Sequence, residues 1–582
     1  NSIITLLSLL LPLNMFVVAQ GGLTVAIGTD AVQQVTQNWS DPGYICQCLE
    51  TDAAEVAKLR KRIRAAEVDG RVTARLYDGK ALPYIDNTVN HLIGSESDLP
   101  SEQEVLRVLV PGGVAILDGK KISKPWPQEI DDWSHYHHNP AGTMVGGDTM
   151  VGPPRRLQWM GEPKWLRNHD FMSSMHAMVS SGGRVYYIID EGLRNHIFLP
   201  SNWQLIARDA FNGTILWKQP LKDWQPSNWP LKSGPGDLPR RIVATPETVY
   251  ATAGLIQPLT AFDARTGRIL RTYQGTEATV EVIHADGTLY LLTAPEKQPV
   301  GFRGESTKYS EIRRANSVWA WKSDSPPRRV IAIDAASGKT HWVHDAKVAP
   351  LTLTVSPTQV FFHNGSNLMA LDRESGESMW TSDSTPIKSV PTGGSLRVVY
   401  ADGVAVFAQG TNMTAFDAET GRTLWTERLQ KTSHHCPEDV FVIDGEIWSP
   451  NTGKPQQNGT HFKVFDLHTG KTNRDFVAEN IQGFPMHPRC YPSRATQRYI
   501  MTNGMGTEFY EIGGTKVDVN NTVRGSCIYG VMPANVLLYK PPDSCACYNQ
   551  SKLEYFCALA PKQEVAAANV TNRLDKGPAF GE

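Results

Sequence analysis

A short motif recurs along the middle of the chain, and it constrains the fold more than any other feature. Its fullest copy reads Met413-Thr-Ala-Phe-Asp-Ala-Glu-Thr-Gly-Arg-Thr-Leu-Trp425. The alternation that leads to Asp417 is typical of a β-strand. Asp417 can accept hydrogen bonds from the turn that follows, and Gly421 can adopt a positive φ at little cost. Trp425 then offers a flat surface to a neighbouring sheet. The motif therefore predicts a strand, a tight turn and a second strand.

Five further copies keep the turn, and three of them keep the tryptophan. They are Asp209 to Gly213 with Trp217, Asp263 to Gly267 with Arg271 in place of tryptophan, Asp334 to Gly338 with Trp342, Asp372 to Gly376 with Trp380, and Asp466 to Gly470 with Arg474. The spacing between successive aspartates is 54, 71, 38, 45 and 49 residues. One blade of a β-propeller takes roughly 40–50 residues. The 71-residue spacing predicts a blade with an insertion near Glu296–Arg329.

A second hairpin pattern precedes most of these turns, as in His284–Tyr290 and Val442–Trp448. Two hairpins make one four-stranded blade. We therefore expect an all-β propeller of seven or eight blades over residues 153–562. Arg155–Trp159 is expected to be a closing strand that pairs with the last blade.

The motif A-x-D-x-x-(T/S)-G-x-x-x-W resembles the tryptophan-docking motif of quinoprotein-type propellers, the PQQ-like repeat family. The resemblance implies that each tryptophan packs between adjacent blades and that the turn residues are structural. For function it leaves two alternatives open. One is a binding or scaffold propeller of the cell envelope. The other is a dehydrogenase of alcohols or sugars that uses pyrroloquinoline quinone (PQQ) with Ca²⁺.

The N-terminal segment indicates an exported protein. Residues 1–20 are mostly apolar and are interpreted as a signal peptide, with an N-terminal anchor as the alternative. Either interpretation places the rest in the periplasm or outside the cell, with membrane contact only through such an anchor. Residues 563–582 are expected to be a linker to a further region. The formal net charge of −2 gives no electrostatic reason to expect a nucleic-acid partner.

Residues 21–118 differ in character, because predicted strands alternate with helices. Strands are expected at Leu23–Ile27, Tyr44–Glu50, Arg71–Arg75 and Val89–Ile93, and helices at Ala53–Ala66 and Ser101–Val110. This order favours an α/β, Rossmann-like domain.

The domain resembles a class I S-adenosylmethionine-dependent methyltransferase. Glu50 falls at the position of that family's ribose-binding acid, Asp78 near its adenine-contacting acid, and Leu109-Val-Pro-Gly-Gly113 matches its L-x-P-G-G turn. Gly28 and Asp30 stand where the cofactor loop is expected. That loop has one glycine where the family has three, so the domain is interpreted as a degenerate, vestigial methyltransferase.

Residues 119–152 are expected to be a linker. They contain Asp131-Asp-Trp-Ser-His-Tyr-His-His138, which is interpreted either as a polar loop laid over the propeller or as a set of metal ligands.

Polar residues early in the propeller are candidates for the mouth of its central funnel. They are His169, Asp170, Asp190, Glu191 and Arg194. A solvated surface loop is the alternative interpretation.

Six of the eight cysteines follow residue 430. In an exported protein they are expected to form disulfides. The alternative is a metal site built from His487, Cys490, Cys527, Cys545 and Cys547. Cys46 and Cys48 alternate on one predicted strand, so a bond between them is not expected.

The order of the whole chain resembles exported PQQ-like repeat proteins of environmental bacteria such as planctomycetes. The sequence therefore favours a binding or scaffold propeller with a vestigial methyltransferase-like domain. Its partner would be a protein, a glycan or a small molecule. A quinoprotein dehydrogenase is the alternative, and a methyltransferase is a weaker one.

Overall fold

The computed structural model describes residues 21–39, 41–95, 97, 101–164, 166, 175–194, 199–224, 236–294, 321–387, 389–390, 396–430, 437–452, 459–479, 491–504, 506–515, 517–543 and 552–562. These residues form two compact units, 21–125 and 126–562. Among the described residues, no helix is both long and apolar enough to cross a membrane.

The first unit is built on one six-stranded sheet with the strand order β3-β2-β1-β4-β5-β6. Strands β1 to β5 run parallel, and β6 is antiparallel to β5. The elements are β1 (Gly22–Ile27), α1 (Thr29–Val35), the 3₁₀ turn η1 (Thr36–Asn38), β2 (Tyr44–Glu50), α2 (Ala53–Ala65), β3 (Val72–Leu76), β4 (Val89–Gly94), α3 (Glu102–Val108), β5 (Leu109–Leu117) and β6 (Lys120–Ser123).

The predicted elements of this unit are present, but the Rossmann-like assignment is supported only in part. The sheet is mixed, and the described residues form three short α-helices beside it. Helix α2 begins where the carboxylate of Asp52 accepts hydrogen bonds from the backbone N–H groups of Ala54 (2.6 Å) and Glu55 (3.2 Å). The helix buries Val56, Leu59 and Ile63 against the sheet.

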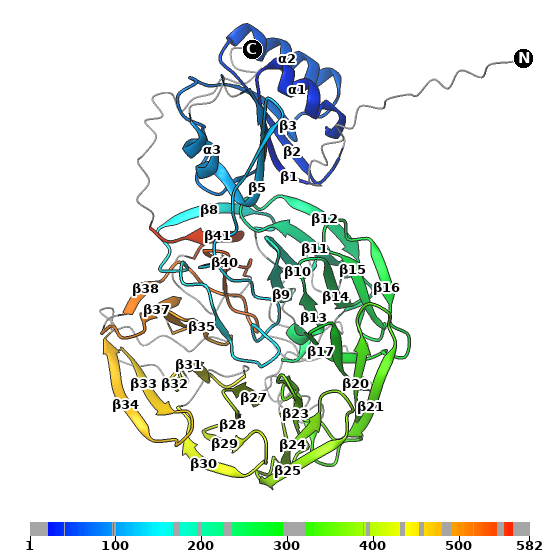
Figure 1. Ribbon diagram of the computed structural model, residues 1–582, viewed down its shortest axis with the longest axis vertical. Coiled ribbons are helices and arrows are strands. Elements are labelled where there is room, and N and C mark those ends of the chain that lie inside the picture. Colours follow the sequence, from blue (N-terminus) through cyan, green and yellow to red (C-terminus); the bar gives the residue numbers. More distant parts are fainter. Residues whose placement is uncertain are drawn as a thin grey trace, which may run out of the picture. The chain divides into compact units, whose positions relative to one another are not determined.

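The second unit is a ring of eight four-stranded blades (Figure 1). Blade 1 holds β9 (Met175–Ser181), β10 (Arg184–Asp190), β11 (Trp203–Asp209) and β12 (Ile215–Pro220), and blade 2 holds β13 (Ile242–Ala244), β14 (Thr248–Thr252), β15 (Leu259–Asp263) and β16 (Ile269–Thr272). Blade 3 holds β17 (Thr279–Ala285), β18 (Thr288–Thr293), β20 (Arg328–Asp334) and β21 (Thr340–Ala346), and blade 4 holds β22 (Thr354–Val355), β23 (Gln359–His363), β24 (Asn367–Asp372) and β25 (Ser378–Ser384).

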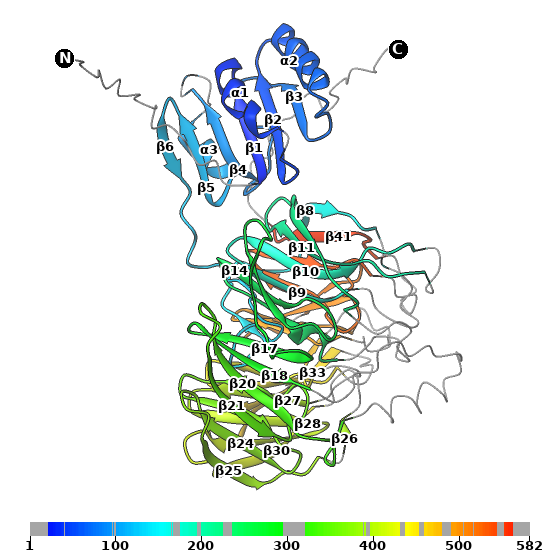
Figure 2. The same ribbon diagram turned by 90° about the vertical axis from the view of Figure 1, so that its right-hand side faces the viewer.

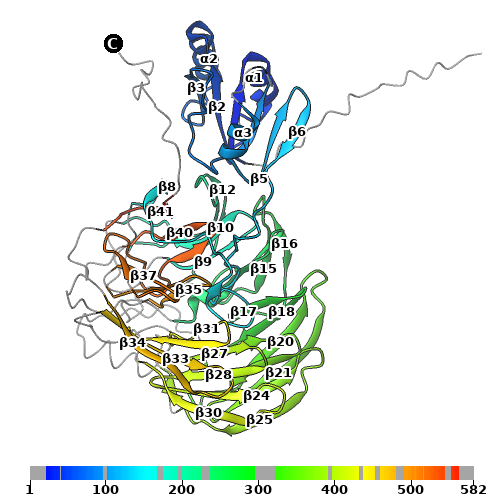
Figure 3. The same cartoon turned by 60° about the vertical axis from the view of Figure 1, so that its left-hand side comes forward.

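The remaining blades follow the same plan around the ring, which Figures 2 and 3 show from two further directions. Blade 5 holds β27 (Leu396–Ala401), β28 (Val404–Gln409), β29 (Asn412–Asp417) and β30 (Thr423–Arg428), and blade 6 holds β31 (Phe441–Ile443), β32 (Glu446–Pro450), β33 (Gly459–Asp466) and β34 (Thr472–Glu479). Blade 7 holds β35 (Arg494–Thr496), β36 (Tyr499–Thr502), β37 (Thr507–Glu511) and β38 (Val517–Asn520), and blade 8 holds β39 (Met532–Ala534), β40 (Leu537–Lys540), β41 (Phe556–Ala560) and β8 (Arg156–Gly161).

The ring closes through a strand from the beginning of the propeller. Strand β8 pairs antiparallel with β41 and becomes the outermost strand of blade 8. The prediction that Arg155–Trp159 forms a closing strand is therefore confirmed. The insertion in blade 3 lies between β18 and β20, and its described part contains β19 (Trp321–Lys322), which pairs with β26 (Ser389–Val390). The short 3₁₀ helix η3 (Leu238–Arg241) leads into blade 2.

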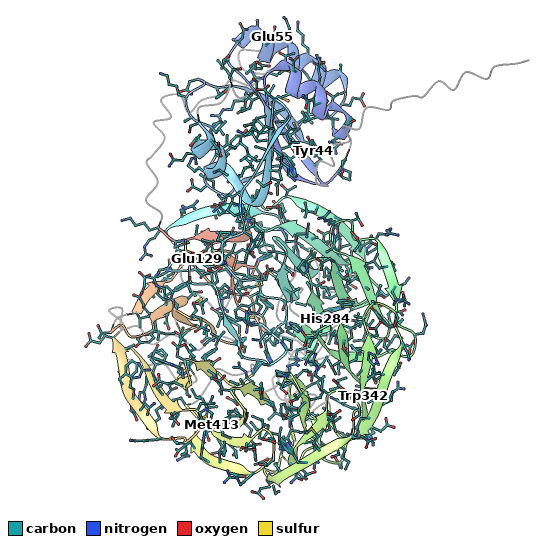
Figure 4. All side chains as sticks on the ribbon, in the orientation of Figure 1. Tyr44, Glu55, Glu129, His284, Trp342 and Met413 are labelled. Carbon is teal, nitrogen blue, oxygen red and sulfur yellow. The ribbon has the colours of Figure 1, made fainter. Side chains whose placement is uncertain are left out.

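Neighbouring blades are joined by the tryptophans of the repeat. In each case the indole Nε1–H donates to the carbonyl that follows the turn aspartate of the next blade. Five such bonds span 2.8–3.1 Å: Trp159 to Ala210, Trp217 to Ala264, Trp342 to Arg373, Trp380 to Ala418 and Trp425 to Leu467. Figure 4 shows Trp342 at the outer rim of the ring. The expectation that these residues pack between blades is confirmed.

The turn glycine lets the indole lie flat on the next blade. Gly421 has φ +73°, and a Cβ atom there would lie 2.5 Å from the ring of Trp380. The junction between blades 2 and 3 is bonded differently. Arg271 takes the tryptophan position of blade 2, and the hydroxyl of Tyr273 donates to the carbonyl of Ala335 at 2.5 Å. The same carbonyl position is thus bonded from a different side chain.

Candidate functional site

A segment that precedes the first blade fills the centre of the ring. We call residues 129–149 the central strap. Figure 1 draws this segment in cyan across the middle of the propeller. Trp133 is 0 % exposed, Tyr136 2 % and Met144 0 %. The strap is therefore part of the propeller core, although its sequence contains three histidines and several acids.

The first half of the strap bonds to the blades in their order around the ring. The backbone carbonyl of Asp131 accepts from Asn535 N–H of blade 8 (3.0 Å), and that of Trp133 accepts from Ser180 N–H of blade 1 (2.9 Å). The carbonyl of Ser134 accepts from Ala244 N–H of blade 2 (3.1 Å). The strap thus satisfies inner-strand N–H groups that would otherwise face an empty channel.

The second half continues around the ring. The carbonyl of Pro140 accepts from Val355 N–H of blade 4, and that of Ala141 accepts from Tyr400 N–H of blade 5, both at 3.0 Å. Strand β7 (Val145–Gly146) then pairs parallel with β35 of blade 7. The segment returns to blade 8, where the Asp148 carboxylate accepts from Val536 N–H at 2.8 Å.

The ends of the strap are tied to each other. Thr149 N–H donates to the carbonyl of Glu129 at 2.9 Å, and the Asp131 carboxylate accepts from Gly147 N–H at 2.6 Å. The strap is consequently a closed loop inside the ring. The expectation of a linker laid over the propeller is wrong at this segment, because the channel of eight blades leaves room that the strap fills.

The three strap histidines do not converge, so they form no metal site. His138 Nε2 lies 2.8 Å from the Asp131 carboxylate, whereas His135 and His137 contact different blades. The described residues contain no cluster of three or more His, Cys, Asp or Glu side chains that could hold a metal ion. The metal interpretation of Asp131–His138 is therefore not supported.

His135 is held as a neutral imidazole. Its Nε2 accepts from the backbone N–H of His284 in blade 3 (3.1 Å), which assigns the proton to Nδ1, where Ser134 Oγ lies at 2.8 Å. Burial, together with the nearby His284 and Arg240, lowers the pKa of His135 to about 3. This histidine is a fixed hydrogen-bonding group between strap and blade at physiological pH.

His137 is also neutral, but it uses the opposite tautomer. Arg240 Nη1 donates to its Nδ1 at 3.0 Å, so the proton resides on Nε2. Arg240 also donates to the carbonyl of Leu353 at 2.6 Å, and its Nε lies 3.1 Å from the carboxylate of Glu281. Burial, with Arg240, Arg397 and Arg494 nearby, lowers the pKa of His137 well below its usual value.

A pocket opens between the strap and blades 1 to 4. Its volume is about 560 Å³, and His284 of its wall lies nearer the centre of the ring than Trp342 (Figure 4). The wall combines strap residues with the ends of inner strands. Its polar side chains are Asp132, Ser134, His135, Asn139, Ser181, Thr245, His284, Asp286, Ser356 and Arg373. Proline, alanine and valine residues complete the wall, so the pocket offers mixed polar and apolar contacts.

The pocket wall is held in place by bonds around its rim. Arg373 pairs with Asp286 at 2.8 Å and donates to the hydroxyl of Tyr290 at 2.9 Å. The ring of His284 stacks on Tyr250 with centroids 5.5 Å apart. Burial raises the pKa of Asp132, whose carboxylate accepts from Gly182 N–H at 2.8 Å. Sequence reasoning missed this pocket, because its residues come from six separate segments.

A second pocket of the propeller, about 630 Å³, is lined by repeat-turn residues such as Asp417 and Ala418. It belongs to the blade junctions that the docking motif builds.

The four residues expected at a methyltransferase-like site are only partly brought together. Gly28 and Asp30 line a pocket of about 370 Å³ at the ends of β1, β4 and β5. Glu50 is buried and accepts from Thr29 Oγ1 at 3.1 Å, and Asp78 is exposed and accepts from Lys80 N–H at 3.0 Å. Neither acid lines the pocket, and a cofactor site for these four residues stays a prediction.

The funnel candidates are scattered. Asp190 is buried and shapes its own loop by accepting from the N–H groups of Gly192 and Asn202, both at 2.8 Å. Glu191 pairs at 2.7 Å with Lys218 of β12, the outermost strand of blade 1. Arg194 is exposed. His169 and Asp170 lie outside the described residues, and a functional role for the five stays a prediction.

The cysteine expectations are mostly untested. Cys527 is buried, but His487, Cys490, Cys545 and Cys547 lie outside the described residues. No disulfide joins two described cysteines. Cys46 and Cys48 are both buried thiols on β2.

The described part of the channel does not fit a quinone with calcium. The strap fills the axis with buried side chains, and the charged groups that approach it include Arg240, Arg397 and Arg494, which repel a cation. The expectation of PQQ and Ca²⁺ stays a prediction for the chain as a whole.

The comparisons with known proteins agree with the propeller. A sequence model of the family described as outer membrane protein assembly factor BamB matches residues 201–365, 323–436 and 363–472, which together span less than half of the chain. No curated protein sequence matches the chain.

Three solved structures match parts of the chain. BamB from Moraxella catarrhalis has a TM-score of 0.36 and 12 % identity, and the match covers 69 % of this chain and 99 % of BamB. Hsv2 from Kluyveromyces marxianus has a TM-score of 0.29 and 11 % identity over 50 % of this chain and 84 % of its own. The [4+2]-cyclase SpnF has a TM-score of 0.16 and 25 % identity over 17 % of this chain and 39 % of its own. The blades from β11 to β33 are similar in sequence to the family of the matching model.

Proposed function

We propose that this chain is a binding or scaffold module, and that it holds a protein partner at the pocket between the central strap and blades 1 to 4. The observation that carries the proposal is the construction of this pocket. Strap and blades join there through Ser134, His135 and Pro140, so a non-repeating segment shapes the surface. Proteins of one fold differ in function through such local sites.

Two further findings support a partner rather than a substrate. The strap occupies the described axis of the ring, where a propeller enzyme would need space for a cofactor. The family that the central blades resemble is described as an outer membrane protein assembly factor. We accordingly propose an exported protein of the cell envelope, with the first unit as an accessory domain.

Site-specific photo-crosslinking tests the binding face. A photo-reactive phenylalanine analogue replaces Pro357, an exposed residue of the pocket wall in blade 4. The matched control carries the analogue at Val343, which is 51 % exposed on β21, the outermost strand of blade 3. Both full-length proteins are illuminated with an envelope extract from the cells that make them.

The proposal predicts one discrete adduct from position 357 and none from position 343, and excess unlabelled protein should suppress it. The same adducts from both positions, or none from either, would contradict it.

Titration with PQQ and Ca²⁺, followed by dye reduction with alcohols and sugars, tests the dehydrogenase alternative. Saturable binding with substrate-dependent reduction would replace the scaffold proposal with an enzymatic one.

A further inference from the structure

Three buried arginines lie around His137 of the strap, and only two carboxyl groups are placed to balance their charge. Arg397 of β27, Arg494 of β35 and Arg240 of η3 surround His137 of the strap. Arg397 and Arg494 are 0 % exposed, and Arg240 is 5 % exposed. Buried charges in proteins are normally paired, because an isolated ion loses its hydration.

Two of the three arginines have an acidic group nearby. Arg240 pairs with Glu281 at 3.1 Å, and Arg397 is attracted by Asp439. Burial raises the pKa of both carboxyl groups. The Asp439 carboxylate also accepts hydrogen bonds from the hydroxyl groups of Ser493 and Thr452. Even when both acids are ionised, one positive charge remains.

Arg494 carries that remaining charge. Its guanidinium donates to the carbonyl of Tyr529 at 2.9 Å and contacts the sulfur of Met144 at 3.8 Å. Its other neighbours are aromatic faces, with Tyr136 at 4.9 Å and Trp133 at 5.5 Å from the ring centroids. No described carboxylate forms an ion pair with Arg494.

Three donors in this region also lack an acceptor. Arg397 Nε, Arg494 Nε and His137 Nε2 are buried with no hydrogen-bond partner. His137 Nε2 is a donor, because its Nδ1 accepts from Arg240. Several unmatched N–H donors beside an unbalanced cation are what an anion requires.

We propose that the propeller axis contains a buried site for a small inorganic anion, held by His137, Arg397 and Arg494. The anion supplies the missing negative charge and accepts from donors that the protein leaves unsatisfied. It thereby joins the strap to blades 5 and 7. This site is separate from the pocket proposed for a protein partner, so either proposal can fail alone.

Thermal unfolding of the full chain tests the site. Chloride or phosphate replaces gluconate, which is too large for the site, at constant ionic strength. Because a ligand that binds only the folded state stabilises it, Tm should rise by roughly 1–2 °C for each tenfold increase in anion above its Kd. If a halide is the natural occupant, chloride should raise Tm at a lower concentration than phosphate does. If an oxyanion is the natural occupant, phosphate should raise Tm at the lower concentration.

Two variants make the test specific. Arg494→Met should lose the Tm response and equal or exceed the wild type in gluconate, since it removes the unbalanced charge. Arg498→Gln is the control, because Arg498 is an exposed residue of the same region, paired with Glu511 at 3.0 Å; it should keep the full response. Equal Tm in all three anions, or a full response in Arg494→Met, would overturn the proposal.

A direct observation does not depend on any variant. Crystals of the wild-type chain soaked in bromide should show an anomalous peak against the guanidinium groups of Arg397 and Arg494. The absence of such a peak at saturating bromide would overturn the site.

Discussion

The outer rim and the centre of this propeller are built on opposite principles. At the rim, one motif recurs, and each tryptophan donates to the same carbonyl of the next blade. At the centre, a single non-repeating strap bonds to successive blades with a different residue each time. The rim therefore fixes the ring, whereas the strap determines what the channel and its pocket can hold. The predictions below test that division.

The largest effect is expected at the centre. Trp133 is 0 % exposed, and its indole Nε1–H donates to the carbonyl of Tyr136 at 3.2 Å. Its backbone N–H donates to Ser180 Oγ at 2.8 Å, and its carbonyl accepts from Ser180 N–H at 2.9 Å. Trp133→Ala removes a large buried ring from a closed space, so it should lower the free energy of unfolding by about 3–5 kcal/mol. Denaturant unfolding measures this loss. A cost below that of a rim tryptophan would contradict the assignment of the strap to the core.

The next largest loss of stability is expected at the rim. Trp380 is only half-buried, so Trp380→Ala should cost about 2–3 kcal/mol, less than full burial would imply. Arg271 occupies the same position in blade 2, where Tyr273 already supplies the interblade bond. Arg271→Ala should therefore cost under about 0.5 kcal/mol. Equal losses in the two variants, measured by the same unfolding assay, would show that the docking position contributes through something other than its ring.

The glycine beneath the indole gives a smaller and sharper comparison. Gly421→Ala places a methyl group 2.5 Å from Trp380 and also strains a backbone at φ +73°. Gly403→Ala has the same backbone strain at φ +78°, but nothing lies within 4 Å. We expect about 1 kcal/mol for Gly403→Ala from the left-handed conformation alone, and about 2 kcal/mol or more for Gly421→Ala. Matching values would mean that the contact with Trp380 is unimportant.

The repeat aspartates should give the smallest effect, and one that depends on pH. The hydroxyl and N–H of Thr420 donate to Asp417 at 2.7 and 2.8 Å, which lowers the pKa of that carboxyl. A carboxyl with a lowered folded-state pKa stabilises the fold above its unfolded pKa, about 3.9, and loses that contribution as the pH falls. Asp417→Asn should therefore lower Tm by about 1 °C at pH 7. The difference from wild type should shrink below pH 4 in a pH series of thermal scans.

The sequence predicted the rim far better than the centre, for a physical reason. The geometry of a repeated turn can be predicted from its local sequence, because Asp417 and Gly421 act on neighbours a few residues away. The strap has no such local signature. Trp133 and Tyr136 stand among acids and histidines, and only the ring of blades around them makes those polar groups core residues. Two aromatic residues in an otherwise polar segment were the one available indication.

The same limit explains the candidate sites. The pocket beside the strap combines His135 with His284 and Arg373, which lie 149 and 238 positions apart from it along the chain. No local pattern could join them. Conversely, Glu50 and Asp78 matched a family pattern by position, yet neither lines the pocket beside Gly28. Spacing along the chain identifies elements, whereas a site depends on which elements become neighbours.

Hydrogen exchange of the full chain, measured by mass spectrometry, tests the central claim most directly. Amide groups of the inner strands β9 and β13 provide the internal reference for protected core. We predict that the amides of Trp133 and Met144 exchange as slowly as that reference, because inside the channel the N–H of Trp133 donates to Ser180 Oγ and that of Met144 donates to the carbonyl of His137. Exchange of the strap at the rate of an exposed loop, with the blades still protected, would contradict its place in the core and with it the proposed binding pocket.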